Sequence, residues 1–189
     1  MKKVLFIFAL MLVTMTAGAQ DIELTPDGAY EKKEVVTVDS VSAAVLYDRA
    51  MMALSDWTGP DGKAKAGIDY QNQETHTVVY KGTFYLGFKG TLLGAGWNRY
   101  GNFTLKVRCK DGRAQVTMTV GTVTGIYNRD NIERSWTVEE IQKAVIKSKG
   151  AKRERGETLL TDIVETVDGI MAAMGAKLKA ADGGDDDDF

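Results

Sequence analysis

The sequence predicts an α+β fold in which an antiparallel sheet carries helices packed on one face. Between residues 76 and 123, apolar and polar residues alternate, which is typical of strands with one buried face. Asp111–Gly112 divides this stretch as a hairpin turn would. Apolar residues at helical spacing precede the strands from residue 43 and follow them from residue 138. Because these helices need an apolar partner, we expect them to cover one sheet face and leave the other open to solvent.

The first twenty residues have the three parts of a secretory signal peptide. Lys2 and Lys3 precede an apolar run over residues 4–13, and the small residues Ala17-Gly18-Ala19 follow it. We therefore expect residues 1–19 to be removed by cleavage after Ala19, and the protein to be periplasmic or secreted. No cysteine near the cleavage point offers a lipid attachment site, so a lipoprotein is not expected. The mature chain offers no transmembrane segment.

Composition favours one domain over residues 20–180. Removing residues 1–19 takes away two lysines and no acid, which changes the formal net charge from −2 to about −4. The only cysteine, Cys109, cannot form an intramolecular disulfide. Its position on the apolar side of a strand favours a buried thiol over an intermolecular bridge or a reactive thiol. The acidic residues 181–189 predict a disordered tail.

In the first half of the domain, residues 34–38 are rich in β-forming residues and lead into a helix that Asp39–Ser42 would cap. Apolar residues recur at three- and four-residue intervals as far as Trp57, and the helix is expected to end near residues 58–62. A short strand is expected over residues 68–71, and a longer one begins near His76. The side chains of the longer strand expected to face the core are Val78, Tyr80, Phe84, Leu86 and Phe88.

The next two strands are expected to form a hairpin, in which a type I′ turn at Asp111–Gly112 joins residues 100–110 to residues 113–123. Their core-facing side chains are expected to be Phe103, Leu105, Val107, Cys109, Val116, Met118 and Val120. Thr137 and Glu140 then form a capping-box pattern ahead of a helix. The apolar residues of that helix, and of a second one expected after Gly156, are Val138, Ile141, Val145, Ile146, Leu159, Leu160, Ile163, Val164, Val167, Ile170, Met171 and Met174.

Four segments together carry a resemblance to a known family. They are Ala17-Gly18-Ala19-Gln20, Val35-Val36-Thr37-Val38-Asp39-Ser40-Val41-Ser42 leading into Leu46-Tyr47-Asp48-Arg49-Ala50, Lys81-Gly82-Thr83-Phe84, and Lys110-Asp111-Gly112-Arg113. With them, roughly residues 17–125 resemble a secreted Bacteroidetes family of unknown function. The resemblance implies a TATA-box-binding-protein-like (TBP-like) fold and an envelope location. It transfers no functional residue.

The outward-facing positions of the predicted sheet are basic or polar, with no acid among them. They are Lys81, Tyr85, Lys89, Thr104, Lys106, Arg108, Arg113, Gln115, Thr117 and Thr119. Such a surface suits an anionic glycan, a lipid head group or an acidic protein segment. The ligand-binding candidates on it are Lys81, Tyr85, Lys106, Arg108 and Gln115. Two alternatives stay open: these residue types also suit a sheet face that is merely solvated, and the acidic tail could screen the face.

Nucleic acid is not expected as a partner, although the implied fold is that of a DNA-binding protein. Function depends on the site rather than the fold, and export separates the protein from the chromosome. Wedging into the minor groove would also need apolar side chains on the open face. Phe84, Phe88 and Phe103 are instead expected on the buried face.

The connection after residue 88 is a second candidate contact site, because Leu92, Leu93 and Trp97 stand among glycines. Large apolar residues in a loop often mark a contact. These three side chains could enter a membrane surface, grip a partner, or fold over the edge of the core.

No catalytic motif, metal site or cofactor site is expected. His76 is the only histidine and is interpreted as structural, and Gly94-Ala95-Gly96 is not a nucleotide-binding loop. Asp69 and Glu74 could act as an acid and base pair, but nothing in the sequence sets their separation. We therefore expect an exported, non-catalytic binding or interaction module. The alternatives are a hydrolase of envelope polymers that uses paired carboxylates and a structural subunit of an envelope assembly.

Overall fold

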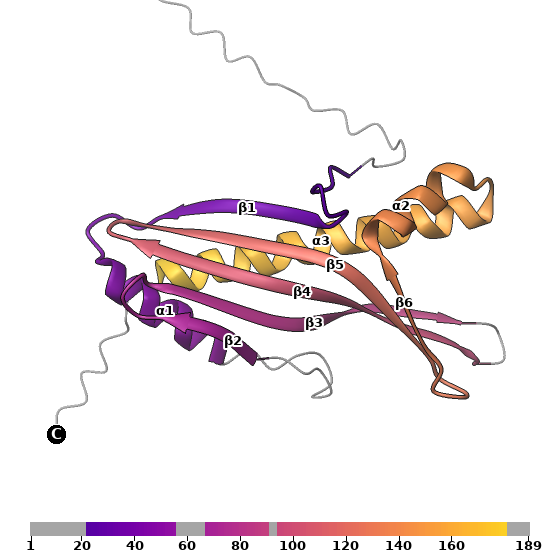
Figure 1. The fold of residues 1–189 in the computed structure, drawn as a ribbon, viewed down its shortest axis with the longest axis horizontal. Coiled ribbons are helices and arrows are strands. Elements are labelled where there is room, and N and C mark those ends of the chain that lie inside the picture. Colours follow the sequence, from indigo (N-terminus) through magenta and orange to yellow (C-terminus); the bar gives the residue numbers. More distant parts are fainter. Residues whose placement is uncertain (1–21, 56–66, 91–93, 181–189) are drawn as a thin grey trace, which may run out of the picture.

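The computed structural model describes residues 22–55, 67–90 and 94–180, which form a six-stranded antiparallel sheet and three helices (Figure 1). The strands are β1 (Tyr30–Thr37), β2 (Gly67–Asn72), β3 (Thr77–Gly90), β4 (Gly96–Lys110), β5 (Arg113–Tyr127) and β6 (Glu133–Thr137). Their order across the sheet is β1-β5-β4-β3-β2, and β6 pairs with the part of β5 beyond β1. The helices are α1 (Ala43–Ser55), α2 (Val138–Lys147) and α3 (Ala151–Lys179).

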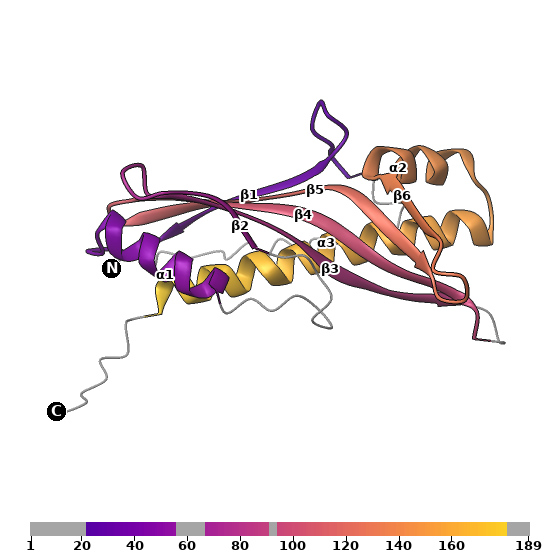
Figure 2. The ribbon, with the colours of Figure 1, turned by 60° about the horizontal axis from the view of Figure 1, so that its bottom comes forward.

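Helices α1 and α3 lie against the same face of the sheet, and α2 packs on α3 beside β6 (Figure 2). The predicted α+β class with helices on one face is therefore confirmed. The core is formed by the helix-facing side chains of the central strands and by the apolar stripe of α3. Its fully buried members include Leu46, Val78, Leu105, Val107, Val116, Met118, Val120, Leu160, Ile163 and Leu178.

A β-bulge changes the facing of one predicted core residue. Tyr85 lies opposite Tyr100, but Phe88 lies opposite Asn98, so β3 has one more residue than β4 between these pairs. Gly87 occupies the bulge at φ +87°, a conformation that glycine adopts without strain. The extra residue reverses the alternation beyond it. Phe88 is consequently 44% exposed on the open face, and its prediction as a core residue was wrong.

The β4–β5 hairpin forms where predicted, but its turn is not type I′. Gly112 has φ +73°, whereas Asp111 is not among the residues with positive φ, and a type I′ turn needs both. The segment before α1 holds the turn from the side. The Asp111 carboxylate Oδ1 accepts a hydrogen bond from the Ala43 N–H at 2.8 Å, and the Gly112 N–H donates to the Val41 carbonyl at 2.8 Å.

The capping box of α2 is confirmed. The Thr137 hydroxyl accepts from the Glu140 N–H at 3.1 Å, and the Glu140 carboxylate accepts from the Thr137 N–H at 2.8 Å. Ile146 was wrongly predicted as a core residue, because it is 67% exposed on the side of α2 that faces solvent. Helix α3 begins at Ala151 rather than after Gly156. Gly156 lies inside it where α2 approaches closely, since a Cβ there would be 2.4 Å from Val145 Cγ2.

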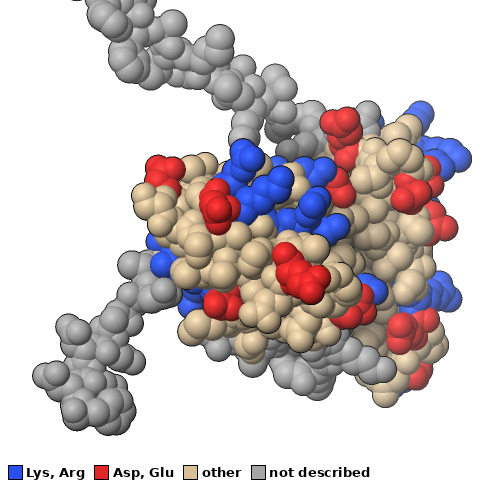
Figure 3. Space-filling model, turned by 60° about the vertical axis from the view of Figure 1, so that its left-hand side comes forward, with Lys and Arg blue, Asp and Glu red and all other residues tan. Residues whose placement is uncertain are grey.

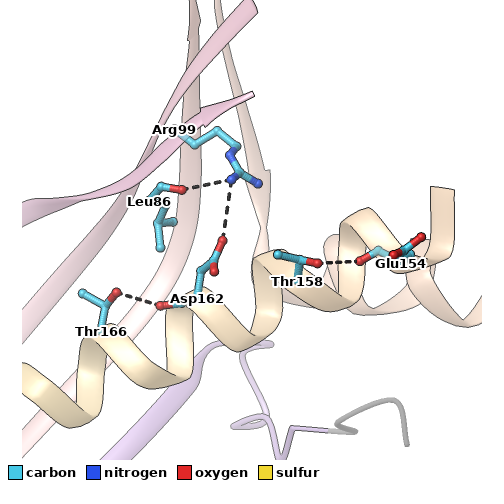
Figure 4. Close-up of polar contacts among 6 residues, drawn as sticks. All are labelled: Leu86, Arg99, Glu154, Thr158, Asp162 and Thr166. Carbon is cyan, nitrogen blue, oxygen red and sulfur yellow. Dashed lines mark hydrogen bonds and ion pairs between the residues drawn. The ribbon is translucent and has the colours of Figure 1, made fainter. Parts of the chain in front are cut away.

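A polar contact joins the sheet to the middle of α3 (Figure 4). The Arg99 guanidinium of β4 donates to the Leu86 carbonyl at 2.9 Å and lies 3.6 Å from the Asp162 carboxylate. The Arg99 side chain is only 16% exposed, which makes this contact stronger than a surface ion pair. Arg99 faces the helices because it alternates with the open-face residues of β4.

Several predictions fall on residues that the structure does not describe. They concern the signal peptide, the acidic tail, the end of the first helix with Trp57, and the loop residues Leu92 and Leu93.

Candidate functional site

The face of the sheet opposite α1 and α3 carries two hollows. In the register of the sheet, the residues of β4 that point to this face are the even-numbered ones, from Asn98 to Lys110. A bulge at Gly121 changes which residues of β5 point to the open face, from odd-numbered ones before it to even-numbered ones after it. Polar side chains lie on this face on both sides of the bulge. The predicted open and polar sheet face is thus present, and both hollows lie on it.

The first hollow, of about 270 Å³, lies at the end of the sheet where the β4–β5 hairpin turns. It is lined by Val35, Thr75, Arg108, Cys109, Lys110, Arg113 and Gln115. Gln115 stands opposite Arg108 on one side and opposite Val35 on the other, and Arg113 stands opposite Lys110. We call Arg108, Lys110, Arg113 and Gln115 the hairpin-end patch. Figure 3 brings this end of the molecule forward and shows lysine and arginine gathered there.

The charges of the hairpin-end patch are uncompensated within the described chain. Arg108, Lys110 and Arg113 form no ion pair with any residue of the described ranges, and no acid lines the hollow. Alternate residues on a strand are about 6.7 Å apart and neighbouring strands about 4.8 Å apart, so one anionic group can approach all three cations. Arginine also offers paired donors that fit carboxylate, sulfate or phosphate oxygens.

The second hollow, of about 600 Å³, lies farther along the same face, between β3 and β6. It is lined by Lys81, Gly82, Thr83, Tyr100, Asn102, Phe103, Thr104, Thr124, Ile126 and Glu133. Unlike the first hollow, it is not basic. Lys81 forms an ion pair with Asp69 at 2.9 Å, and the Glu133 carboxylate is part of its lining.

Hydrogen bonds between side chains organise the floor of the second hollow. The Asn102 Nδ2 donates to the hydroxyls of Thr122 and Thr124, each at 2.9 Å. The Thr124 and Ser135 hydroxyls are also 2.9 Å apart. These contacts connect β4, β5 and β6 across the open face and hold the Asn102 amide in one orientation.

The predicted candidates divide between the two hollows. Arg108 and Gln115 line the first, and Lys81 lines the second. Lys106 is exposed and stands opposite Thr117, and it lines neither hollow. Tyr85 is 38% exposed, with its ring 5.4 Å from that of Tyr100 and its hydroxyl 3.3 Å from Asn98 Oδ1.

Sequence reasoning missed the acids that border this face. Glu31 comes from β1, whose partner β5 is far away in the sequence; Asp69 lies at a register shift of β2; and Glu133 comes from β6, which was not predicted. It also left Lys110, Tyr100 and Asn102 out of the candidates, although their even numbering on the predicted strand would have placed them on the same face as Arg108.

Trp97 lies in strand β4 rather than in a connecting loop, and its side chain faces the helix side of the sheet. Its ring is 5.3 Å from Tyr127 and 6.0 Å from Trp136, and the Arg134 guanidinium lies 5.7 Å from its centroid. Of the three predicted roles, folding over the edge of the core is the one that these contacts favour.

The surroundings of Cys109, His76 and Asp69 indicate structural rather than chemical roles for these side chains. Cys109 is 4% exposed, and burial raises the pKa of its thiol to about 11, which disfavours the reactive thiolate. The His76 carbonyl accepts from the Cys109 N–H at 2.9 Å, and its ring lies edge-on to Tyr47 at 6.1 Å. Asp69 faces Lys81.

Two features are absent from residues 22–55, 67–90 and 94–180. No group of three or more histidine, cysteine or acidic residues there could hold a metal ion. No helix formed by these residues is long and apolar enough to cross a membrane.

The six-stranded sheet with helices on one side and an open opposite face defines an α+β protein of the TBP-like fold. Residues 33–122 match the family model described as "Domain of unknown function (DUF4468) with TBP-like fold". Residues 33–122 are therefore similar to the DUF4468 family, and the resemblance found from the sequence is confirmed. The family description assigns no function to it.

Solved structures share this fold. A DUF4468 family protein from Bacteroides ovatus is 15% identical, with a TM-score of 0.57 over 83% of this chain and 90% of that chain. A TBP-like protein from Parabacteroides distasonis is 10% identical, with a TM-score of 0.59 over 83% of this chain and 97% of that chain. At these identities the likeness concerns the fold alone. Comparison with the curated proteins gave no match.

Proposed function

We propose that the protein is an exported, non-catalytic binding module whose hairpin-end patch holds an anionic ligand of the cell envelope. The observation that carries the proposal is the gathering of Arg108, Lys110 and Arg113 around one hollow without a carboxylate partner among the described residues. Like charges held together on a rigid sheet repel one another, and a bound anion removes that repulsion. The mature chain is acidic overall, so this concentration of positive charge is local.

Export is supported by the pattern of residues 1–19. The test is to express the full chain, including residues 1–19, in a bacterial host and to analyse the periplasmic fraction by mass spectrometry. A mature protein that begins at Gln20 is the expected product. Retention of residues 1–19 on a cytoplasmic protein would contradict export.

Ligand binding is tested with three anionic probes that differ in chemistry. They are an oligogalacturonate, a heparin-derived oligosaccharide and vesicles containing phosphatidylglycerol. The variant Arg108→Glu/Arg113→Glu is compared with Lys149→Glu/Lys152→Glu, which makes the same change in net charge at exposed positions around the start of α3. Losing two charge-assisted contacts at an exposed site of this kind weakens binding by about 10-fold.

The expected result is that at least one probe binds, that the Arg108→Glu/Arg113→Glu variant binds it about 10-fold more weakly, and that the control variant binds it as the wild type does. Binding should also weaken as salt is raised, because exposed charges are screened within about 10 Å at 0.1 M ionic strength. Equal binding by both variants would sink the proposal. A complex with an envelope protein that survives high salt would instead favour the structural-subunit alternative.

A further inference from the structure

The second hollow differs from the hairpin-end patch in the ligand chemistry that it suits. Its one lysine, Lys81, is paired with Asp69, and Glu133 adds a carboxylate to the lining. This balance disfavours an anionic group, because Glu133 would repel it. The same hollow offers hydroxyl, amide and carboxylate groups beside the half-buried ring of Tyr100 and the side chain of Ile126.

We propose that the second hollow is a subsite for an uncharged pyranose ring, so that the open face binds an acidic polysaccharide as an extended chain. The inference rests on the proposed function of the hairpin-end patch and names the class of its ligand. A pyranose ring carries hydroxyls around its edge and C–H groups on its faces. It therefore needs both hydrogen-bonding groups and an aromatic or aliphatic surface, which the second hollow provides together.

The hydrogen-bonding groups of the second hollow are pre-oriented. The Asn102 Nδ2 donates hydrogen bonds to both Thr122 and Thr124, and these bonds fix the direction of the Asn102 Oδ1 acceptor. The Thr124 hydroxyl is in turn held by Ser135. A ligand hydroxyl that replaces water here meets groups that lose little conformational entropy on binding.

The aromatic surface is formed by Tyr100, which lines the hollow, and by Tyr85, which packs against Tyr100 outside the lining. The Tyr85 and Tyr100 rings are 5.4 Å apart, and the Tyr85 hydroxyl is held by Asn98 at 3.3 Å. Because this contact holds the tip of Tyr85 and the rings support each other, the pair offers a stable platform beside Asn102. Tyr85, one of the two predicted sheet-face candidates that line neither hollow, thereby acquires a role.

The spacing of the two hollows selects an extended ligand. Arg108 and Asn102 are six residues apart on β4, which corresponds to about 20 Å along the strand. A single small anion cannot reach both. A chain of several sugar units, with an acidic group at the hairpin-end patch and a neutral ring in the second hollow, can engage them together, and linkage of two weak sites raises affinity.

A single-stranded nucleic acid fits this face less well. Such a ligand needs a basic groove along its whole backbone. Here Glu31 and Glu133 stand on the open face, opposite Thr119 and Ile126, and Asp69 borders it. The acidic side chains interrupt the track that a phosphate backbone would follow.

The test is titration calorimetry with hyaluronan oligosaccharides of two, four, six and eight units, in which uronate and neutral sugar alternate. A parallel series of chondroitin sulfate fragments distinguishes carboxylate from sulfate as the anionic group, and an octaglutamate peptide tests an acidic protein segment. The variants are Tyr100→Ala and Asn102→Ala. Tyr70→Ala is the matched control, since Tyr70 is an exposed tyrosine of the same sheet that lines neither hollow.

We expect at least a 10-fold gain in affinity between the two-unit and eight-unit oligosaccharides. Tyr100→Ala and Asn102→Ala should lower the eight-unit affinity about 5-fold and leave the two-unit affinity unchanged, and Tyr70→Ala should change neither. The variant Arg108→Glu/Arg113→Glu should weaken every length. Near-equal affinity for all lengths, or no effect of Tyr100→Ala and Asn102→Ala, overturns the inference while the proposed function of the patch survives.

Two other outcomes also overturn the inference. Octaglutamate that binds as tightly as the eight-unit fragments, with the same dependence on Tyr100, would identify a peptide ligand. If no oligosaccharide of either series binds, the inference fails, and the oligogalacturonate, heparin and vesicle probes decide the proposed function separately.

Discussion

Replacing Gly101 by alanine should destabilise the protein, although glycine in a strand is ordinarily less favourable than alanine. Gly101 lies in the middle of β4, opposite Phe84 on β3 and Val123 on β5, and faces the helices. A Cβ at this position would be 2.4 Å from Phe84 Cζ and 2.5 Å from Phe84 Cε2. The ring would have to retreat by about 1 Å to reach ordinary contact distance.

The size of the effect follows from how tightly Phe84 is held. Phe84 is 4% exposed, and its ring centroid is 5.9 Å from that of Phe103. Overpacking of this kind costs about 1–3 kcal/mol, against which the lower entropy of the unfolded alanine variant returns about 0.4–1 kcal/mol. The net loss is therefore about 1–2 kcal/mol, or roughly 2–8 °C in Tm for a chain of this length.

Urea denaturation followed by circular dichroism measures the change, with Gly121→Ala as the matched control. Gly121 is also a strand glycine, but nothing lies within 4 Å of the position of its added Cβ. Gly121→Ala should leave the free energy of unfolding unchanged or raise it slightly. If Gly101→Ala is as stable as Gly121→Ala, Phe84 does not pack over Gly101. The alignment of β3 with β4 beneath the second hollow would then be wrong.

Three further predictions test other parts of the fold. Thr137→Ala removes the N-cap of α2 and should lower the free energy of unfolding, measured by urea denaturation, by about 1 kcal/mol. The double variant Thr137→Ala/Glu140→Ala should lose less than the sum of the two single losses, because the two residues share the capping box. Additive losses would contradict the shared box. Burial raises the pKa of the Cys109 thiol from 9.0 to about 11, so between these values the unfolded chain loses its thiol proton first. Stability should therefore fall as pH rises from 9 to 11, and a Cys109→Ala variant should not show this part of the decline; an aromatic disulfide reagent that reacts fully with the native protein at pH 8 would refute the burial. Arg99→Met keeps the apolar stem but removes the hydrogen bond to Leu86, and should lower the free energy of unfolding by about 2 kcal/mol. Asp162→Asn should lower it by less than about 1 kcal/mol, because the Asp162 carboxylate is more exposed. Equal losses would show that the ion pair carries the contact.

Local sequence signals predicted the elements whose stabilisation is local. The capping box at Thr137 and Glu140 needs only four consecutive residues, and its hydrogen bonds are present. The alternation over β4 and the stripe from Leu160 to Met174 report burial directly, because one face of each element meets the core. The fold class follows from these signals together with the order of the elements.

The sequence could not predict features that depend on a facing strand or helix. The bulge at Gly87 is defined by its register against β4, and without that register Phe88 appears to continue the apolar face. Strand β6 is short and mostly exposed, so it lacks the alternation that marked the other strands. In the sequence, Gly156 resembles a helix boundary. In the structure it lies within α3, where the close approach of Val145 leaves no room for a side chain.

The candidate site could be predicted only in part, for a related reason. Arg108 and Gln115 belong to adjacent strands of one hairpin, so their common face could be read from the turn between them. Glu133 lines the second hollow from β6, and Asp69 pairs with its Lys81 from a register shift in β2; no local pattern places either acid. The sequence therefore predicted a face of basic and polar residues with no acid among them. The structure instead separates a basic end from a region where charges are balanced.

This separation is itself an argument for a binding face over a solvated one. A surface that only keeps a protein in solution mixes charges of both signs, because neighbouring opposite charges lower the electrostatic free energy. The open face follows that pattern around Lys81 and Asp69, and around Lys33 and Glu31. It departs from the pattern at Arg108, Lys110 and Arg113, in a chain whose acids outnumber its bases. Among the described residues, Lys106 extends this unpaired positive charge along the same face, and a concentration of it around one hollow is what the proposed binding of an anionic ligand predicts.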